Sequence, residues 1–147
     1  MFVLDANVLL DAVNQRSACH TRCLALVEKC RTGTDICLLT WSICYEFLRV
    51  STDLRALPSP LLATDALRFL ESLMASDRFS MLVPTEQHAS VLRQTLNENP
   101  HVSGNVMHDV HVAVLMREHG IRRIYTRDTD FHKFKFLDPI DPTVGAD

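Results

Sequence analysis

The chain has 147 residues, of which 47% are hydrophobic and 22% are charged, and its formal net charge is -3. This length and composition predict a single domain over residues 1–147 with a substantial buried core. The charge lacks the positive excess typical of nucleic-acid-binding proteins, but it does not exclude RNA as a partner, because acids that hold divalent cations are neutralised. Without a long apolar run or an N-terminal signal pattern, the sequence predicts a cytoplasmic protein that does not enter a membrane.

In chain order, short apolar runs alternate with stretches of helical periodicity. The expected elements are a strand at 2–4, an apolar helical turn after Asn7, a helix at 20–31, a strand at 36–39, a helix at 41–50, a helix at 61–75, a strand at 79–83, a helix at 86–97, a helix at 106–119 and a strand at 123–125. Thr40 is expected to cap the helix that follows it, Ser59 and Pro60 to open the next helix, and Gly120 to end the last one. The tail at 139–147 is expected to form a loop.

Strands that alternate with helices predict an α/β fold of three layers, with a mostly parallel central sheet flanked by helices. In such sheets, ligands bind beyond the carboxyl ends of the strands. Asp5 follows the first predicted strand directly, and Asp128 and Asp130 follow the last one. Taken alone, Asp5 or Asn7 could simply cap the next helix, and Asp11 is expected to be solvated.

Two further acids fall on predicted helices. Glu46 is expected on the same inward face as Ile43 and Phe47, and Asp109 on the same face as Val112 and Met116. An ionised carboxylate in an apolar environment needs a cation or a hydrogen-bond donor nearby. For Glu46, a buried salt bridge to an arginine is the alternative to a metal.

Convergence of these acids at one sheet edge would raise their pKa values and destabilise the fold unless a positive charge lay among them. No Lys or Arg is embedded in the acidic segments except Arg127, and its alternation with Asp128 points it away. Mg2+ or Mn2+ suits such oxygen ligands and leaves room for phosphate oxygens. The constellation therefore predicts metal-assisted attack of water on a phosphodiester.

Four segments in this order resemble the motifs of PIN-domain ribonucleases, and the chain length resembles that of VapC-type toxins. The segments are Leu4-Asp5-Ala6-Asn7, Glu46 within residues 42–48, Asp109 within residues 108–111, and residues 126–131. The resemblance implies that an acidic quartet of Asp5, Glu46, Asp109 and Asp128 is catalytic and holds Mg2+ or Mn2+. It further implies Asp130 as an additional ligand, with Asn7 and Thr126 as supporting polar residues.

The same resemblance implies a toxin of a type II toxin-antitoxin system that cuts RNA endonucleolytically, with structured RNA such as tRNA or rRNA as substrate. A homodimer and a small cognate antitoxin are the implied protein partners. A PIN-like module that binds RNA or a partner without turnover remains the alternative. A phosphohydrolase or phospho-acceptor domain is a further alternative, although the first strand ends in Asp5-Ala6-Asn7 rather than in the D-x-D-x-T pattern that phosphohydrolases need.

Several residues outside the quartet carry open interpretations. His108 and His111 flank Asp109 and could bind a transition metal, but surface or supporting positions are the favoured interpretation. The basic candidates for RNA contact are Arg16, Arg49, Arg55 and Lys133. The apolar stretch at 51–74 is interpreted as core with a possible partner or dimer groove.

The cysteines form an odd set confined to the first third of the chain. They are Cys19, Cys23, Cys30, Cys37 and Cys44. An odd number in a chain without an export signal predicts reduced, mostly buried thiols rather than disulfides. Cys19 and Cys23 lie one helical turn apart beside His20, so zinc binding is the alternative to burial.

Overall fold

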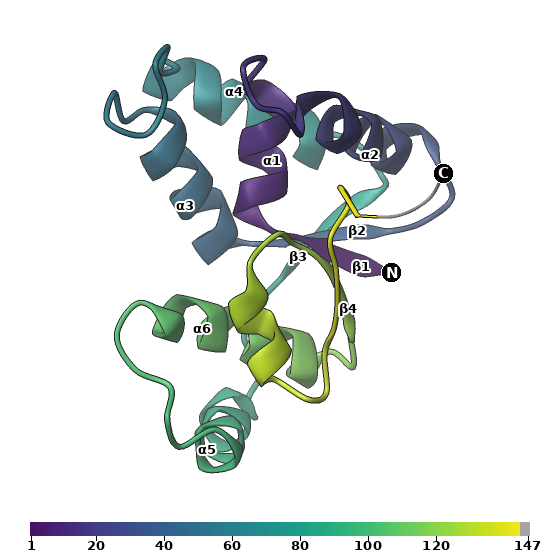
Figure 1. The fold of residues 1–147 in the computed structure, drawn as a ribbon. Helices are drawn as coiled ribbons and strands as arrows, with labels where there is room; N and C mark the ends of the chain where they lie inside the picture. The colour runs from purple at the N-terminus through teal and green to yellow at the C-terminus, as the bar shows by residue number, and fades with distance from the viewer. Residues whose placement is uncertain (145–147) are drawn as a thin grey trace.

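A computed structural model describes residues 1–144 of the chain. Within these residues a sheet of five parallel strands has the order β3-β2-β1-β4-β5 (Figure 1). The strands are β1 (Phe2–Leu4), β2 (Cys37–Thr40), β3 (Phe79–Leu82), β4 (Arg123–Tyr125) and β5 (Asp138–Ile140). The central strand β1 is buried along its whole length, as expected for a strand covered on both faces.

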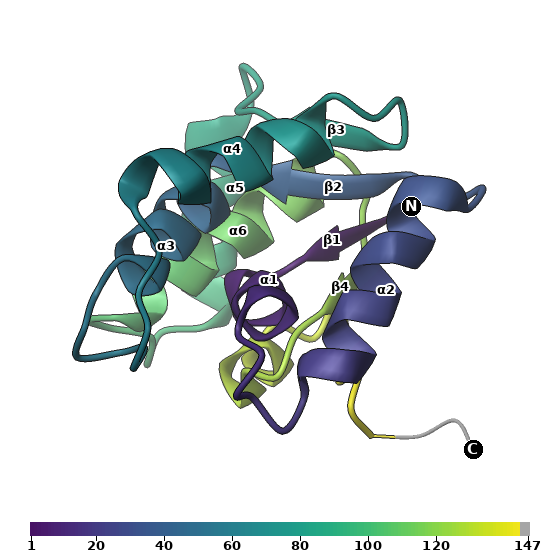
Figure 2. The same cartoon turned by 90° about the horizontal axis from the view of Figure 1, so that it is seen from above.

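Helices cover both faces of the sheet, which confirms the predicted α/β fold of three layers. They are α1 (Ala6–Val13), α2 (His20–Thr32), α3 (Trp41–Ser51), α4 (Ala63–Met74), α5 (His88–Glu98), α6 (Val106–Glu118) and the 3-10 helix η1 (Thr129–Lys133). In Figure 1, α1, α2 and α4 lie on one side of the sheet, and α5 and α6 lie on the other. Figure 2 shows the same layers from above, with α3 at one end, where it packs against α1, α4 and α6.

Two predicted boundaries are confirmed by the hydrogen bonds at helix ends. The Thr40 hydroxyl accepts a hydrogen bond from the backbone N–H of Ile43 at 3.1 Å, so Thr40 caps α3. Gly120 follows α6 with a φ of 66°, a left-handed conformation that glycine adopts without strain. The N–H of Ile121 then bonds to the Met116 carbonyl at 2.8 Å, which ends the helix and turns the chain toward β4.

Two other predictions about local structure are wrong. Pro139 and Ile140, at the start of the tail predicted as a loop, belong to β5, which pairs in register with β4 through Ile124 opposite Pro139. Proline is tolerated there because β5 is an edge strand. Residues 141–144 are without strand or helix, and residues 145–147 lie outside the described residues. Helix α4 begins at Ala63 rather than after Ser59 and Pro60, because the N–H of Leu61 bonds to the Ser51 carbonyl at 2.8 Å and holds this segment against the end of α3.

The described cysteines are all free thiols, as predicted. Four of them are buried, and Cys19 is partly exposed. The ring of His20 contacts the backbone carbonyl of Asp11 at 3.1 Å. In residues 1–144, the cluster that could hold a metal contains no cysteine, so the structure offers no support for the zinc alternative at Cys19 and Cys23.

The helices described by the structure are not of the length and apolarity needed to cross a membrane.

Candidate active site

Asp5 lies at the carboxyl end of β1 and is fastened to the end of β4. Leu4 and Tyr125 are register partners, so Asp5 and Thr126 leave the sheet side by side. The Thr126 hydroxyl donates to Asp5 Oδ2 at 2.6 Å, and Asn7 Nδ2 donates to the same oxygen at 2.6 Å. The N–H of Ala6 donates to Asp5 Oδ1 at 2.7 Å, so Asp5 also caps α1. With 6% of its surface exposed, Asp5 is a buried acid surrounded by donors.

Asn7 and Thr126 extend this network to the loop after β4. The Thr126 hydroxyl accepts hydrogen bonds from Asn7 Nδ2 at 3.1 Å and from the backbone N–H of Asp128 at 2.9 Å. The Asn7 side-chain oxygen accepts a hydrogen bond from the N–H of Arg127 at 3.1 Å. The two polar residues that were predicted to support the site therefore hold Asp5 and the Asp128 loop together.

Arg127 turns away from the acids, as its alternation with Asp128 predicts. Its guanidinium donates to Asp11 Oδ2 at 2.7 Å. The expectation that Asp11 is solvated is wrong, because its side chain is only 14% exposed and also accepts a hydrogen bond from Ser17 Oγ at 2.6 Å. Arg127 and Asp11 thus tie the loop after β4 to α1.

Three carboxylates that are less buried than Asp5 form a second group, the outer cluster. Asp109 from α6, Asp128 at the cap of η1 and Asp130 within η1 each offer an oxygen within 4.8 Å of the other two. Asp128 Oδ1 accepts a hydrogen bond from the N–H of Asp130 at 2.8 Å, which fixes their relative positions. The cluster lines a hollow of about 360 Å³ together with Glu46, Arg49, Asn105, Val106 and His108.

Mutual repulsion and burial shift the pKa values of two acids upward. Burial raises the pKa of Asp109 to about 7, with further contributions from the charges of Asp128, Asp5, Asp130 and Glu46. Burial also raises the pKa of Asp5 to about 6, although its hydrogen bonds to Thr126 and Ala6 oppose the shift. Among the described residues, no hydrogen bond to the Asp109 carboxylate offsets the repulsion there. Asp109, Asp128, Asp130 and Glu46 therefore line one hollow, and Asp5 lies close enough for its charge to act on Asp109.

Glu46 occupies a different position from the one predicted. Ile43 and Phe47 are buried, but Glu46 lies at the edge of their face, and its side chain is 46% exposed. It lines the acidic hollow without joining the cluster of Asp109, Asp128 and Asp130. The Arg49 guanidinium lies 4.0 Å from the Glu46 carboxylate. Glu46 therefore has an arginine partner, as the alternative expected, but the pair is exposed rather than buried.

No Lys or Arg other than Arg127 lies within the acidic segments, but two cations from just outside these segments reach the acids. Lys133 Nζ donates to Asp130 Oδ1 at 2.5 Å, and Arg49 lines the hollow beside Glu46. Sequence analysis missed both pairings, although each has the i,i+3 spacing that brings side chains together on a helix. Of the other basic candidates, Arg55 pairs with Asp53 at 3.1 Å and lies outside this hollow.

The histidines near Asp109 divide between two environments. His108 lines the acidic hollow, whereas the ring of His111 lies against the ring of His88, with the centroids 5.7 Å apart. His88 in turn contacts the buried carboxylate of Glu118 at 2.6 Å. The metal-ligand cluster in residues 1–144 consists of carboxylates, which favours the interpretation of His108 and His111 as supporting or surface residues.

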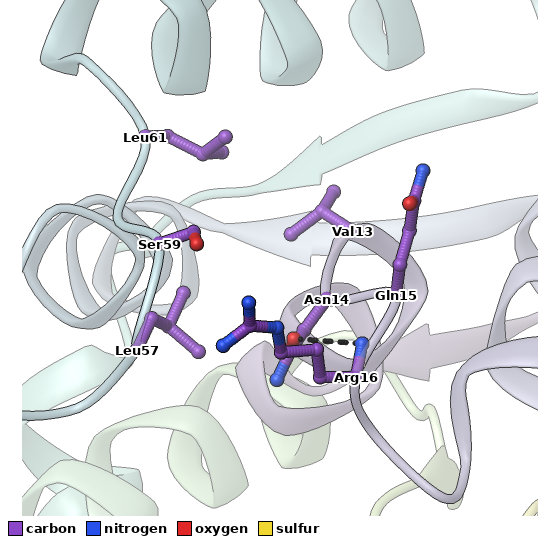
Figure 3. Close-up of a pocket in the computed structure, with 7 residues that line it drawn as sticks. All are labelled: Val13, Asn14, Gln15, Arg16, Leu57, Ser59 and Leu61. Carbon is purple, nitrogen blue, oxygen red and sulfur yellow. Dashed lines mark hydrogen bonds between the residues drawn. The ribbon is translucent and has the colours of Figure 1, made fainter.

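A separate hollow of about 310 Å³ lies between the end of α1 and the segment before α4 (Figure 3). Its lining residues are Val13, Asn14, Gln15, Arg16, Leu57, Ser59 and Leu61. None of these side chains is acidic, so this hollow cannot hold a cation in the way the outer cluster can. Arg16, a predicted RNA contact, therefore borders a different surface from the acids.

Comparison with known proteins places the chain among relatives of similar length. The PIN domain family model matches residues 2–137. Ribonuclease VapC48 of Mycobacterium tuberculosis is 30% identical over 142 residues, which cover 96% of this chain and 97% of the relative. Ribonuclease VapC37 of the same organism is 31% identical over 135 residues, which cover 92% of each chain.

Solved structures support the same fold. VapBC-1 from nontypeable Haemophilus influenzae matches with a TM-score of 0.65 and 18% identity, covering 97% of this chain and 98% of that one. VapC20 of Mycobacterium tuberculosis, described as a sarcin-ricin loop cleaving toxin, matches with a TM-score of 0.63 and 16% identity, covering 90% and 93%. The solved structures show only the fold, whereas the family model and the relatives with at least 30% identity also show the family. The chain belongs to the PIN-domain family and is of its VapC ribonuclease type.

Proposed function

We propose that this chain is the toxin of a toxin-antitoxin pair and cleaves RNA by hydrolysis of phosphodiester bonds in the presence of Mg2+ or Mn2+. The observation that carries the proposal is the outer cluster of Asp109, Asp128 and Asp130, whose oxygens lie within 4.8 Å of one another. Family membership makes nuclease chemistry the activity to test first at this site.

The donor set fits a hard divalent cation. Carboxylate oxygens are the ligands that Mg2+ and Mn2+ prefer. Burial raises the pKa of Asp109 to about 7, and the charges of the neighbouring acids add to this rise. We infer that Asp109, Asp128 and Asp130 hold the ion, with Asp5 and Glu46 completing its acidic surroundings. When bound there, the ion would supply Lewis-acid polarisation of the scissile phosphate and a more acidic water.

The residues around the cluster have roles that follow from their contacts. Thr126 bonds both Asp5 and the backbone of Asp128, so it positions two of the acids of the quartet. Arg49 and Lys133 border the cluster and can donate N–H groups to phosphate oxygens. Arg49 is paired with Glu46, and Lys133 with Asp130. A phosphate that enters the hollow would therefore replace one of these carboxylates as the partner of the cation.

Substrate and partners follow from the relatives. Because VapC20 is described as cleaving the sarcin-ricin loop, we propose structured RNA such as rRNA or tRNA as the substrate. The structural neighbours VapBC2 of Rickettsia felis and FitAB are toxin-antitoxin complexes, so we propose a cognate antitoxin for this chain as well. A homodimer is proposed on family membership alone. The five free thiols fit the reducing cytoplasm.

An exposed apolar surface suggests where the antitoxin would bind. Leu54 is 70% exposed, Leu62 71% and Leu67 42%. All three lie within the stretch 51–74, which the sequence analysis interprets as core with a partner or dimer groove. Exposed leucines of this kind suit the apolar face of a partner helix. A peptide encoded by the adjacent reading frame should bind the wild-type chain, and Leu62→Asp should weaken that complex.

The activity is tested with Asp109→Asn and a matched control, Asp77→Asn, in which an exposed acid away from the cluster is changed. Wild-type and Asp77→Asn proteins should cleave RNA with Mg2+ or Mn2+ and stop with EDTA, whereas Asp109→Asn should lose at least about a hundred-fold in rate. Wild-type rates in Asp109→Asn would discard the assignment. RNA binding without cleavage by the wild type would support the inactive-module alternative, and turnover of small phosphate esters would point to a phosphohydrolase.

A further inference from the structure

A second hollow adjoins the acidic one. It measures about 260 Å³ and is lined by Ser42, Tyr45, Glu46, Arg49 and His108. Glu46, Arg49 and His108 also line the acidic hollow, so the two spaces share a wall. A ligand that places a phosphate at the acids can therefore extend a neighbouring group into the second hollow.

The wall of this second hollow includes the ring of Tyr45, and the ring of Trp41 lies beside that of Tyr45. Tyr45 is 68% exposed and Trp41 is 51% exposed. They lie one turn apart on α3, with ring centroids separated by 6.4 Å and planes tilted by 51°. In contrast, Phe47 on the same helix is fully buried in the core. The exposed rings thus form a surface beside the site that packing does not require.

We propose that this second hollow binds an unpaired nucleobase of the RNA, next to the phosphate held at the acids, with the base stacked on Tyr45. The inference rests on the proposed ribonuclease function and adds a determinant of substrate choice to it. Proteins that recognise single-stranded RNA stack its bases on aromatic rings and on the guanidinium planes of arginine. Here Tyr45 supplies the ring and Arg49 the guanidinium.

Continuity with the acidic hollow favours a nucleobase over a protein segment as the occupant. The shared wall includes Arg49, which can reach a phosphate on one side and a base on the other. A base attached to a phosphate at Asp109 and Asp128 has to lie close to this wall. RNA in a loop or bulge offers such an unstacked base, whereas a regular duplex does not.

Steady-state cleavage tests the role of Tyr45. Tyr45→Ala should raise KM about ten-fold, because stacking of one base on an aromatic ring contributes binding of this order. Tyr45→Phe keeps the ring and should stay close to wild type. Val83→Ala is the matched control, because Val83 is 49% exposed but lies outside the hollow, and its KM should not change.

Abasic substrates locate the interaction on the RNA. After the cut has been mapped, an abasic nucleotide on one side of it should raise the wild-type KM as much as Tyr45→Ala does. With that substrate, Tyr45→Ala should cause no further loss. A KM unchanged by Tyr45→Ala, or a loss that persists with abasic nucleotides on both sides, overturns the proposal.

Trp41 provides a binding signal that is independent of cleavage, because it is the only tryptophan in the chain. A short single-stranded oligoribonucleotide added to the Asp109→Asn protein should quench its fluorescence. Adding Tyr45→Ala to this variant should weaken the apparent affinity about ten-fold. Quenching with this dependence on Tyr45, but without cleavage by the wild type, would refute the ribonuclease proposal and leave the base site standing.

Cleavage by the wild type, together with an oligoribonucleotide affinity that Tyr45→Ala does not change, would refute the base site and leave the ribonuclease proposal intact. Size-exclusion chromatography with light scattering covers the remaining possibility, a protein contact through the same rings. A change in oligomeric state in Tyr45→Ala assigns the ring to such a contact and overturns the proposal. Because Tyr45 is exposed, we expect an unchanged thermal unfolding temperature.

Discussion

The inner and outer acids of the site have opposite environments. Asp5 is 6% exposed and accepts hydrogen bonds from Thr126, Asn7 and the N–H of Ala6. Asp109 lies only partly buried on α6, and its carboxylate faces other acids. The fold alone can hold the inner acid in place, but the charges of the outer acids remain only partly compensated.

This difference separates the residues that the fold requires from those that metal binding and catalysis require. Hydrogen bonds to Asp5 oppose the rise in its pKa, which still reaches about 6 because of burial. At Asp109 the neighbouring charges add to burial, and the pKa reaches about 7. Residues that stabilise the inner acid should therefore affect folding, whereas residues of the outer cluster should affect metal binding and catalysis.

The largest effect on folding is expected from Thr126→Val, which would break the inner network. The variant removes a donor to Asp5 and an acceptor for the N–H of Asp128, both near the sheet edge. We expect a loss of about 2–3 kcal/mol in the free energy of unfolding, because buried partners are left without hydrogen bonds. Urea unfolding measures this loss. Thr126→Ser retains the hydroxyl and should lose much less; equal stability of Thr126→Val and wild type would contradict the role of the network.

The next effect sharpens the description of the outer cluster. Asp109→Asn should weaken Mn2+ binding by at least about ten-fold, measured by calorimetry. Glu46→Gln should weaken it less, because Glu46 lies outside the cluster. Asp35→Asn, at an exposed acid on another surface, is the control and should bind like the wild type. A larger loss in Glu46→Gln than in Asp109→Asn would relocate the ion toward α3.

The pH dependence of stability should distinguish the metal-free site from the metal-bound one. The pKa values of Asp5 and Asp109 rise from 3.8 to about 6 and about 7 on folding, so the folded protein binds protons more tightly. Their contribution to stability is complete below pH 3.8 and is lost as the pH rises through 6 and 7. In EDTA, Asp109→Asn should therefore exceed wild type in unfolding temperature at pH 8 by about 3 °C, and the difference should shrink toward pH 5.

Added Mn2+ is the control for this experiment. It should raise the unfolding temperature of the wild type at pH 8 and have little effect on Asp109→Asn. In EDTA, the wild type should lose stability relative to Asp109→Asn as the pH rises from 5 to 8. The opposite change would contradict the repulsion among the acids.

The smallest effect is expected from Lys133→Met. The pair with Asp130 joins side chains that are 49% and 38% exposed, so its loss should change stability by less than about 0.5 kcal/mol. Removal of the positive charge should slightly tighten Mn2+ binding, by about two-fold, because Asp130 no longer has a competing partner. Weaker binding in Lys133→Met would mean that Lys133 positions Asp130 rather than competing for it.

Much of the fold followed from local patterns. The strands before Asp5 and Thr126, the cap at Thr40 and the turn at Gly120 depend on nearby residues, and all four agree with the structure. The strand around Pro139 could not be predicted in this way, because it exists only through pairing with β4. The start of α4 depends similarly on a hydrogen bond from Leu61 to Ser51.

The sequence predicted which acids belong to the site better than it predicted their exposure and their partners. Strand ends and helix faces brought Asp5, Asp109 and Asp128 together as expected. The exposure of Glu46 was missed because a residue at the edge of an apolar face turns inward or outward according to its neighbours in space. The pairings of Arg49 with Glu46 and of Lys133 with Asp130 were missed although their i,i+3 spacing was a local signal, because only residues within the acidic segments were considered as cations.

The short strand β5 has a consequence for how this chain can associate with others. Asp138 and Ile140 direct their backbone hydrogen bonds toward the β4 side, so the backbone nitrogen of Pro139 faces outward. Proline has no N–H, and an edge without a donor at its centre is a poor template for a further strand. Uncontrolled polymerisation through this margin of the sheet is therefore disfavoured.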